Sequence, residues 1–164
     1  MLVVAADDAT GESLLEWIGS GFIAAGAAAT DENVEDAALP FDRRRHGLLL
    51  GMGAVGLVIE REDAVQERGM IPLAELLASR MSNSAFHGTR LDAAHIAAEF
   101  CRFTQDTLAA AQTTPEKFAR QAVFMSHETF TPARGGSAAA EMAAIPAAFG
   151  ESAHQMLIAN TKGF

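Results

Sequence analysis

FMSHETFTP, residues 124–132, sets the architecture of the chain, because an apolar run there gives way to polar and titratable residues. Residues 122–125 are typical of a buried strand, and His127 follows just past its carboxyl end. A second apolar run at 156–159 repeats the pattern and leads to Lys162. Because sites in open α/β sheets lie beyond the carboxyl ends of strands, we predict that His127 and Lys162 share a reaction centre. The alternative is two ordinary strands that end in solvated polar residues.

Three motifs follow one another along the chain: PFDRRRHGLLLGMGAVGLVIE at residues 40–60, HETFTP at 127–132 and NTKGF at 160–164. They resemble, in that order, PFDxxRxGFxxGEGAGxxVLE, His-Gly-Thr-x-Thr-Pro and the start of Ser-Thr-Lys-x-x-Thr-Gly-His. These are motifs of the β-ketoacyl synthases, the condensing enzymes of fatty-acid and polyketide assembly. The resemblance covers nearly the whole chain. It implies an α/β fold of the layered, thiolase-like kind, with residues 1–164 forming a partial domain that is mostly the second half of a ketosynthase.

The resemblance also implies a reaction, a decarboxylative Claisen condensation. An acyl group is passed to an active-site cysteine, and a malonyl-type extender then loses carbon dioxide to give the enolate that attacks the acyl thioester. Such chemistry needs an activated thiolate and hydrogen-bond donors aimed at the developing enolate oxygen. No cofactor or metal is implied, because both thioesters are carried on the phosphopantetheine of an acyl carrier protein. That carrier is the expected partner, and a homodimer is the expected assembly.

Four residues receive roles from the resemblance, and a fifth, Glu141, is added as a carboxylate near them. The neutral imidazole of His127 is expected to donate to the enolate oxygen, and Lys162 to fix the charge and hydrogen-bond network of the site. Thr129 and Thr131 match the threonines that line the phosphopantetheine arm. Glu141 is expected to support the site as a carboxylate partner of Lys162.

The chain departs from the family pattern in several places. Glu128 replaces the usual glycine and is expected to add bulk and charge beside His127, and Met52 stands where the family has glutamate. The stretch from His127 to Glu141 is longer than in the family, and the residues after Lys162 continue in an uncommon way. These departures indicate a divergent subgroup, expected as one domain of a large multidomain synthase.

The ends of the chain lead to a further expectation. The sequence opens inside an apolar run and closes inside a motif, whereas domain boundaries usually fall in polar linkers. We therefore expect a piece of a longer polypeptide, with the nucleophilic cysteine before Met1 and the second catalytic histidine after Phe164. Such a fragment is predicted to be inactive alone.

Two other functions stay open. A ketosynthase-like protein that has lost its cysteine would serve as a non-catalytic dimer partner that shapes the acyl channel. The residue at the upstream nucleophile position separates that reading from an enzyme. The third possibility is an unrelated α/β binding domain, whose fold would lack the thiolase-like layers.

Composition excludes several classes. The chain has 164 residues, 49% of them hydrophobic, which suffices for the core of one domain. A net charge of −9 argues against a nucleic-acid partner, which would need clustered Lys and Arg. The trio Arg43–Arg45 is interpreted as a solvated turn or, alternatively, as a docking point for an acidic carrier protein. The acidic residues 31–36 are interpreted as a solvated loop, because they show no metal-ligand geometry.

Cysteine usage and hydropathy bear on the compartment. The single cysteine, Cys101, excludes an internal disulfide and fits a reducing compartment. No apolar run reaches the roughly 18 to 20 residues of a membrane span. Residues 1–6 lack the basic flank of a signal peptide, so we predict a cytoplasmic protein without a membrane partner.

The secondary structure follows from periodicity and breakers. Strands are predicted at 2–6 and at 48–59, where Gly47, Gly51, Gly53 and Gly56 are expected to mark close packing. Helical spacing follows residue 12 and contains Trp17, which we expect in the core. Later helices are predicted from an N-cap at Asp92 to residue 111, from a capping box at Thr113 to residue 120, and from Ser137 toward Ile145. Pro146 is expected to stop or kink the last one, and Cys101 falls within a helix as a structural thiol.

Overall fold

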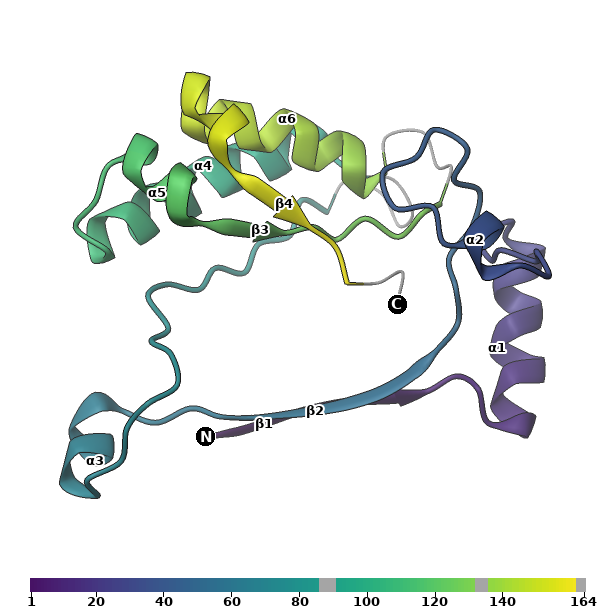
Figure 1. Cartoon of the computed structure of the whole chain (residues 1–164), viewed down its shortest axis with the longest axis horizontal. Coiled ribbons are helices and arrows are strands. Elements are labelled where there is room, and N and C mark those ends of the chain that lie inside the picture. The colour runs from purple at the N-terminus through teal and green to yellow at the C-terminus, as the bar shows by residue number, and fades with distance from the viewer. Residues whose placement is uncertain (86–90, 132–135, 162–164) are drawn as a thin grey trace. The chain divides into compact units, whose positions relative to one another are not determined.

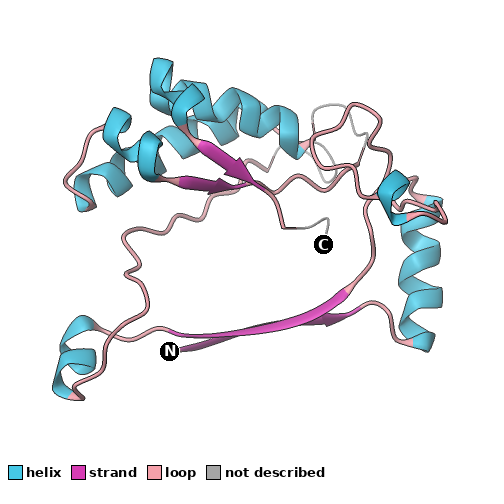
Figure 2. Cartoon of the chain, viewed as in Figure 1, coloured by secondary structure: helices cyan, strands magenta, loops and turns pink. Residues whose placement is uncertain are grey.

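The structure is a computed structural model that describes residues 1–85, 91–131 and 136–161 (Figures 1 and 2). Its elements follow in the order β1 (Leu2–Asp8), α1 (Glu12–Ala24), α2 (Val34–Ala37), β2 (Met52–Val58), α3 (Glu62–Glu67), α4 (Ala93–Ala110), α5 (Pro115–Gln121), β3 (Val123–Met125), α6 (Ser137–Phe149), the 3-10 helix η1 (Gly150–Gln155) and β4 (Leu157–Ala159). The chain divides into two compact units. The first comprises residues 1–26 and 50–76, and the second residues 27–49 and 77–164.

The second unit contains the parallel strand pair that the sequence predicts. Phe124 of β3 lies opposite Ile158 of β4, and Met125 lies opposite Ala159. Alternation along the strands turns Phe124 and Ile158 toward the core, whereas Met125 is 53% exposed on the other face. Since the strands are parallel, both carboxyl ends lie at one edge, which confirms the predicted arrangement of the two strands.

Aromatic side chains build the core of this unit. Phe149 of α6 is buried with Ala119, Ile145 and Met156. The ring of Phe118 stacks on that of Phe149 at a centroid distance of 6.1 Å. Helices α4 and α6 pack against each other (Figure 1). Full burial of a phenylalanine side chain contributes about 1.5–3 kcal/mol, so the burial of Phe149 helps to hold the short strands in place.

Local capping explains where two of the helices begin. Asp92 caps α4 as predicted, because its Oδ1 accepts a hydrogen bond from the His95 amide at 3.0 Å. The predicted cap at Thr113 is wrong by one residue. Thr114 caps α5, and its hydroxyl accepts from the Lys117 amide at 3.4 Å. Proline at the first helical position needs no N–H partner, so the cap falls on the residue before it.

Helix α6 runs through Pro146 to Phe149, so it does not stop at the proline, and the kink expected as the alternative stays a prediction. A proline inside a helix removes one backbone hydrogen bond, but burial of Ile145 and Phe149 on either side keeps the last turn helical. Gly150 ends the helix with a positive φ of 55°. Among the helices that the structure describes, none combines the length and apolarity of a membrane span.

The first unit contains an antiparallel pair, β1 and β2, in which Leu2 lies opposite Val58 and Asp8 opposite Met52. Every residue of both strands is exposed. Trp17 of the neighbouring helix α1 is 76% exposed, so its predicted core position is wrong for this structure. The helical spacing is confirmed, but it places the indole on a face that nothing in the described chain covers.

The predicted strand at 48–59 begins only at Met52, and Leu48 instead makes an isolated bridge to Ala28. A Cβ on Gly47 would lie 2.2 Å from the Ala29 amide nitrogen, so the backbones approach there as closely as only glycine allows. A Cβ on Gly51, Gly53 or Gly56 would meet no atom within 4 Å. The expected close packing therefore holds at the first glycine and is wrong at the other three.

Candidate site at the strand ends

The carboxyl ends of β3 and β4 are joined by hydrogen bonds beyond the strands themselves. The Ser126 amide donates to the Ala159 carbonyl at 2.8 Å and extends the ladder by one residue. Asn160 then donates through its side-chain amide to the carbonyls of Ser126, at 3.3 Å, and Glu128, at 2.9 Å. The loop that follows β3 is thus fixed to the residue that follows β4.

Helix α6 holds the backbone of His127. The Glu141 carboxylate accepts from the His127 amide at 2.6 Å and from the Ser126 hydroxyl at 2.5 Å. The Ser137 hydroxyl donates to the His127 carbonyl at 3.5 Å. The histidine itself is exposed. The arrangement presents an imidazole at the sheet edge on a backbone that is fixed on both sides.

Three of the other predicted site residues lie in or beside this loop. Thr129 and Thr131 are half-buried, and their hydroxyl oxygens are 3.3 Å apart. Glu141 is next to His127, as just described. Lys162 lies outside the described residues, so its predicted pairing with Glu141 stays a prediction.

Glu128 is 2% exposed and therefore belongs to the interior of the loop. Its Oε1 lies 2.9 Å from Nε of Arg45 and accepts from the Phe130 amide at 3.0 Å. The Arg45 Nε–H makes no hydrogen bond among the described residues, so the contact is one of charges. The expectation of a solvated arginine turn is correct for Arg44, whose side chain is 77% exposed, but wrong for Arg45.

Ser126, Asn160 and Arg45 also take part in this site, although none of the three was predicted from the sequence. Ser126 directly precedes His127, and Asn160 directly follows the predicted strand at 156–159, so their polarity beside an apolar strand was an available signal. For Arg45 the signal was weaker. An acid in place of the usual glycine calls for a basic partner if it is buried, but the sequence does not say which base is near.

Two exposed ion pairs lie in the segment before residue 47. The Asp31 carboxylate, 2.5 Å from the His46 imidazole, raises the pKa of that histidine, and the Arg44 carbonyl adds to the effect. The hydrogen bond from the Arg44 side chain lowers the pKa of Asp42 to about 2. Among the described residues, no three His, Cys, Asp or Glu side chains come together as metal ligands would.

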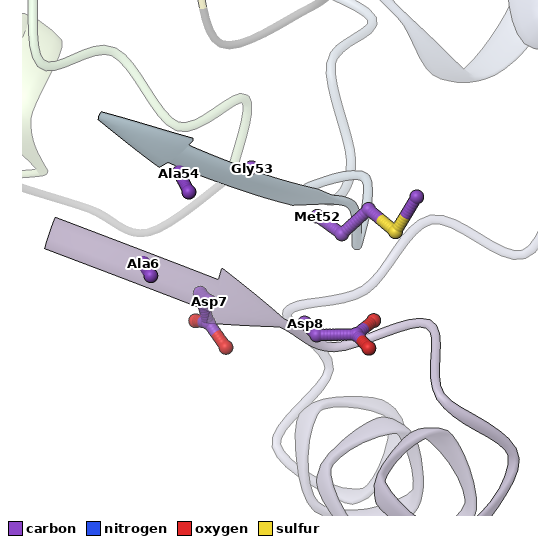
Figure 3. A pocket seen from close by; sticks show the side chains of 6 residues that line it. All are labelled: Ala6, Asp7, Asp8, Met52, Gly53 and Ala54. Carbon is purple, nitrogen blue, oxygen red and sulfur yellow. The ribbon is translucent and has the colours of Figure 1, made fainter. Parts of the chain in front are cut away.

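Two further features of the described chain lie away from this loop. A shallow depression on β1 and β2 is lined by Ala6, Asp7, Asp8, Met52, Gly53 and Ala54 (Figure 3). One Asp8 oxygen accepts from the hydroxyl and amide of Thr10 and from the Gly11 amide, so this carboxylate shapes the turn. Cys101 lies half-buried within α4, as predicted, and is a free thiol.

Comparison with known proteins points to one class of enzyme. No family model matches the chain. The 3-oxoacyl-[acyl-carrier-protein] synthase 2 of Coxiella burnetii (strain RSA 493 / Nine Mile phase I) is 33% identical over 143 residues, which are 87% of this chain and 33% of that protein. The corresponding protein of Staphylococcus aureus is 32% identical over 149 residues, covering 87% of this chain and 34% of its own length. The chain thus spans about one third of the curated relatives it matches.

Solved structures agree. A chain of the AntDE–AntF complex, a type II polyketide synthase acyl-carrier protein with its ketosynthase bound to the hexaketide, has a TM-score of 0.74 and 27% identity. The match covers 99% of this chain and 38% of that one. A β-ketoacyl synthase from Burkholderia phymatum STM815 has a TM-score of 0.73 and 29% identity, covering 99% and 36%. In sequence over most of its length and in fold, the chain is therefore similar to one part of a β-ketoacyl synthase, and its α/β fold is the thiolase-like fold of those enzymes.

Proposed function

We propose that the chain is part of a β-ketoacyl-[acyl-carrier-protein] synthase and supplies the part of its site that acts on the malonyl-type extender. One observation carries this proposal. His127, in a stretch that matches the family's His-Gly-Thr-x-Thr-Pro, is exposed at the edge of two parallel strands, with its backbone fixed by Glu141 and Ser137. The similarity to 3-oxoacyl-[acyl-carrier-protein] synthases supports the assignment.

In the proposed reaction the extender breaks its bond to the carboxylate, releases carbon dioxide and leaves an electron pair on the α-carbon as a thioester enolate. His127 donates a hydrogen bond to the enolate oxygen as charge develops there. The α-carbon then attacks the acyl carbonyl on the cysteine, and the thiolate leaves. Donors held in place before reaction stabilise such charge most effectively, which is the contribution of the bonds from α6 to the His127 backbone.

The remaining site residues take complementary roles in the proposal. Thr129 and Thr131 lie in the same loop as His127, with hydroxyls close enough to bind one polar chain. We propose that they contact the phosphopantetheine arm of the extender's acyl carrier protein. Lys162 is proposed to set the charge of the site, and Glu141 to support it.

The nucleophile in this proposal is a cysteine outside the printed sequence. Cys101 is unsuited, because it lies half-buried in the middle of α4 instead of at a strand-to-helix turn. We therefore propose that residues 1–164 form a partial domain that does not condense substrates alone. A cytoplasmic site of action, which a single cysteine favours, and a homodimer complete the proposal.

The test uses the full-length protein, an acyl thioester and a malonyl-loaded carrier protein. Intact-mass measurement should show one acyl adduct, and the complete mixture should yield a β-ketoacyl product. Cys101→Ser is the matched control and should form the same adduct. A well-folded protein that takes up no acyl group would contradict the catalytic assignment and favour the non-catalytic dimer partner.

A further inference from the structure

We propose that Glu128 and Arg45 form a positioning pair, which ties the loop after β3 to the turn at residues 40–46 and thereby orients His127. The inference rests on the proposed function in one respect, the reaction that His127 serves. The resembled motifs have an arginine at the position of Arg45 and a glycine at that of Glu128. The buried acid is thus a feature of this chain, placed against a residue that the family also has.

Burial is the first observation behind the pair. A carboxylate taken out of water is strongly unfavourable unless an opposite charge and hydrogen bonds compensate it. The Glu128 side chain is 3% exposed and that of Arg45 27%, with the guanidinium Nε 2.9 Å from Oε1. A second Arg45 nitrogen donates to the Asp42 carbonyl at 3.0 Å, which anchors the arginine to its own turn. Removing Arg45 would leave the Glu128 carboxylate buried without an opposite charge, and removing Glu128 would leave the half-buried guanidinium without one.

The second observation is the shape of the loop. Phe130 has a positive φ of 62°, a left-handed conformation that costs a residue with a side chain roughly 1–2 kcal/mol. Its side chain is fully buried, and its amide donates to Glu128 Oε1 at 3.0 Å. The same carboxylate oxygen therefore binds Arg45 and holds the strained residue of the loop.

A chain of hydrogen bonds connects this carboxylate to His127. The Glu128 amide donates to the Ser126 hydroxyl at 2.9 Å, and that hydroxyl donates to Glu141 at 2.5 Å. Glu141 in turn accepts from the His127 amide at 2.6 Å. A shift of Glu128 would move Ser126 and, through Glu141, the backbone that presents the imidazole. Because Glu128 is buried, it acts through these contacts as a positioning residue.

The test compares Glu128→Gln, Arg45→Met, Arg45→Lys, the double variant of Glu128→Gln with Arg45→Met, and Arg44→Met, all in the full-length protein. Glu128→Gln keeps an oxygen for the Phe130 amide and removes only the charge. Arg44→Met is the matched control, since Arg44 is an exposed neighbour paired with Asp42. The measurements are acyl uptake by intact mass, kcat and KM for carbon dioxide release from the malonyl-loaded carrier, and hydrogen exchange of residues 126–131.

Both single variants should lower kcat for carbon dioxide release roughly tenfold to a hundredfold, because small misplacements of a reacting group have effects of that size. Acyl uptake and KM should stay within about twofold of wild type. The kcat of the double variant should be no lower than that of the poorer single variant, because the effects of two residues that act through one contact do not add. Arg45→Lys, which keeps the charge, should recover most of kcat. Arg44→Met should leave every quantity unchanged.

Two results for kcat would overturn the pair. One is an Arg45→Met variant whose kcat equals that of Arg44→Met. The other is a double variant whose fold-reduction in kcat is the product of the two single reductions. If a single variant does not fold, Arg45→Lys decides, since a positioning role requires it to keep activity. A wild-type protein without acyl uptake or carbon dioxide release would contradict the proposed function. In that case hydrogen exchange of residues 126–131 still tests the pair. It should rise equally in Glu128→Gln and Arg45→Met, and an unchanged rate would refute the pair.

Discussion

The two strand pairs of this chain differ in what covers them. Strands β1 and β2 have seven residues each, and all fourteen are exposed. Strands β3 and β4 have three residues each, yet Phe124 and Ile158 pack against a core built by helices α4, α5 and α6. The candidate site follows the shorter pair. Strand length and apolar content therefore do not indicate where a rigid edge forms, whereas a covered face does.

The consequence for function is direct. A site needs side chains held by groups that are themselves fixed, and the β3–β4 edge has Glu141 and Asn160 for that purpose. At the matching end of β1 and β2, Asp8 instead shapes the next turn through Thr10 and Gly11. The first unit presents apolar side chains to solvent, and the second positions polar ones.

The largest expected difference concerns the aromatic core. Phe149→Ala should lower the free energy of unfolding by about 3–5 kcal/mol, because it leaves a cavity beside Phe118 and Ile145. Trp17→Ala, at a side chain that is 76% exposed, should change it by less than about 0.5 kcal/mol. Urea unfolding measures both. A loss at Trp17 that equals the loss at Phe149 would show that the face of α1 is covered after all.

The glycines give a smaller and sharper contrast. Gly47→Ala should destabilise the protein by about 1–3 kcal/mol, because the new Cβ meets the Ala28–Ala29 backbone and the bridge must open. Gly53→Ala enters open space within β2 and should stabilise the chain by about 0.5–1 kcal/mol. Thermal unfolding checks both variants. Equal changes in stability for the two variants would contradict the claim that the backbone is crowded at Gly47 and open at Gly53.

Part of this arrangement follows from local sequence and part does not. The β3 and β4 strands, the Asp92 cap and the helix around Cys101 were predicted, because each depends on residues a few positions apart. Whether α6 stops at Pro146 or continues past it could not be decided from the local sequence, since buried neighbours outweigh the local penalty of a proline. The exposure of Trp17 was not predicted for a related reason. Helical periodicity shows that a residue lies on the apolar face of a helix, but it does not show whether another element covers that face.

The candidate site divides in the same way. His127, Thr129 and Thr131 were selected from motifs and strand ends, and Glu141 as a charge partner for Lys162. The structure places all four around one loop. The contact between Glu128 and Arg45 joins residues 83 positions apart in the chain. No local sequence pattern predicts that two such distant residues come close in space. Long-range charge pairing is set by the fold as a whole and has to be observed.

The smallest expected effect is a pH dependence at the His46–Asp31 pair. The carboxylate raises the pKa of His46 above its usual 6.5, so the pair's stabilisation is fully present below that pH and is lost as pH rises through the raised value. Asp31→Asn should lower the pKa of His46, and Asp36→Asn should lower it less, because Asp36 is the weakest of its contributors. Titration of the imidazole by NMR measures both shifts. An unchanged pKa in Asp31→Asn would rule out the pair in solution.

The central claim is that His127, held at the edge of β3 and β4, serves the enolate and not the acyl-cysteine. The most direct measurement is therefore His127→Ala in the full-length protein, followed both by acyl uptake in intact mass and by formation of the β-ketoacyl product. We expect an unchanged acyl adduct and a rate of condensation reduced by about 10²–10³-fold, the usual effect of removing one donor to a developing oxyanion. Condensation at the wild-type rate, or loss of the acyl adduct in a folded variant, would contradict the account.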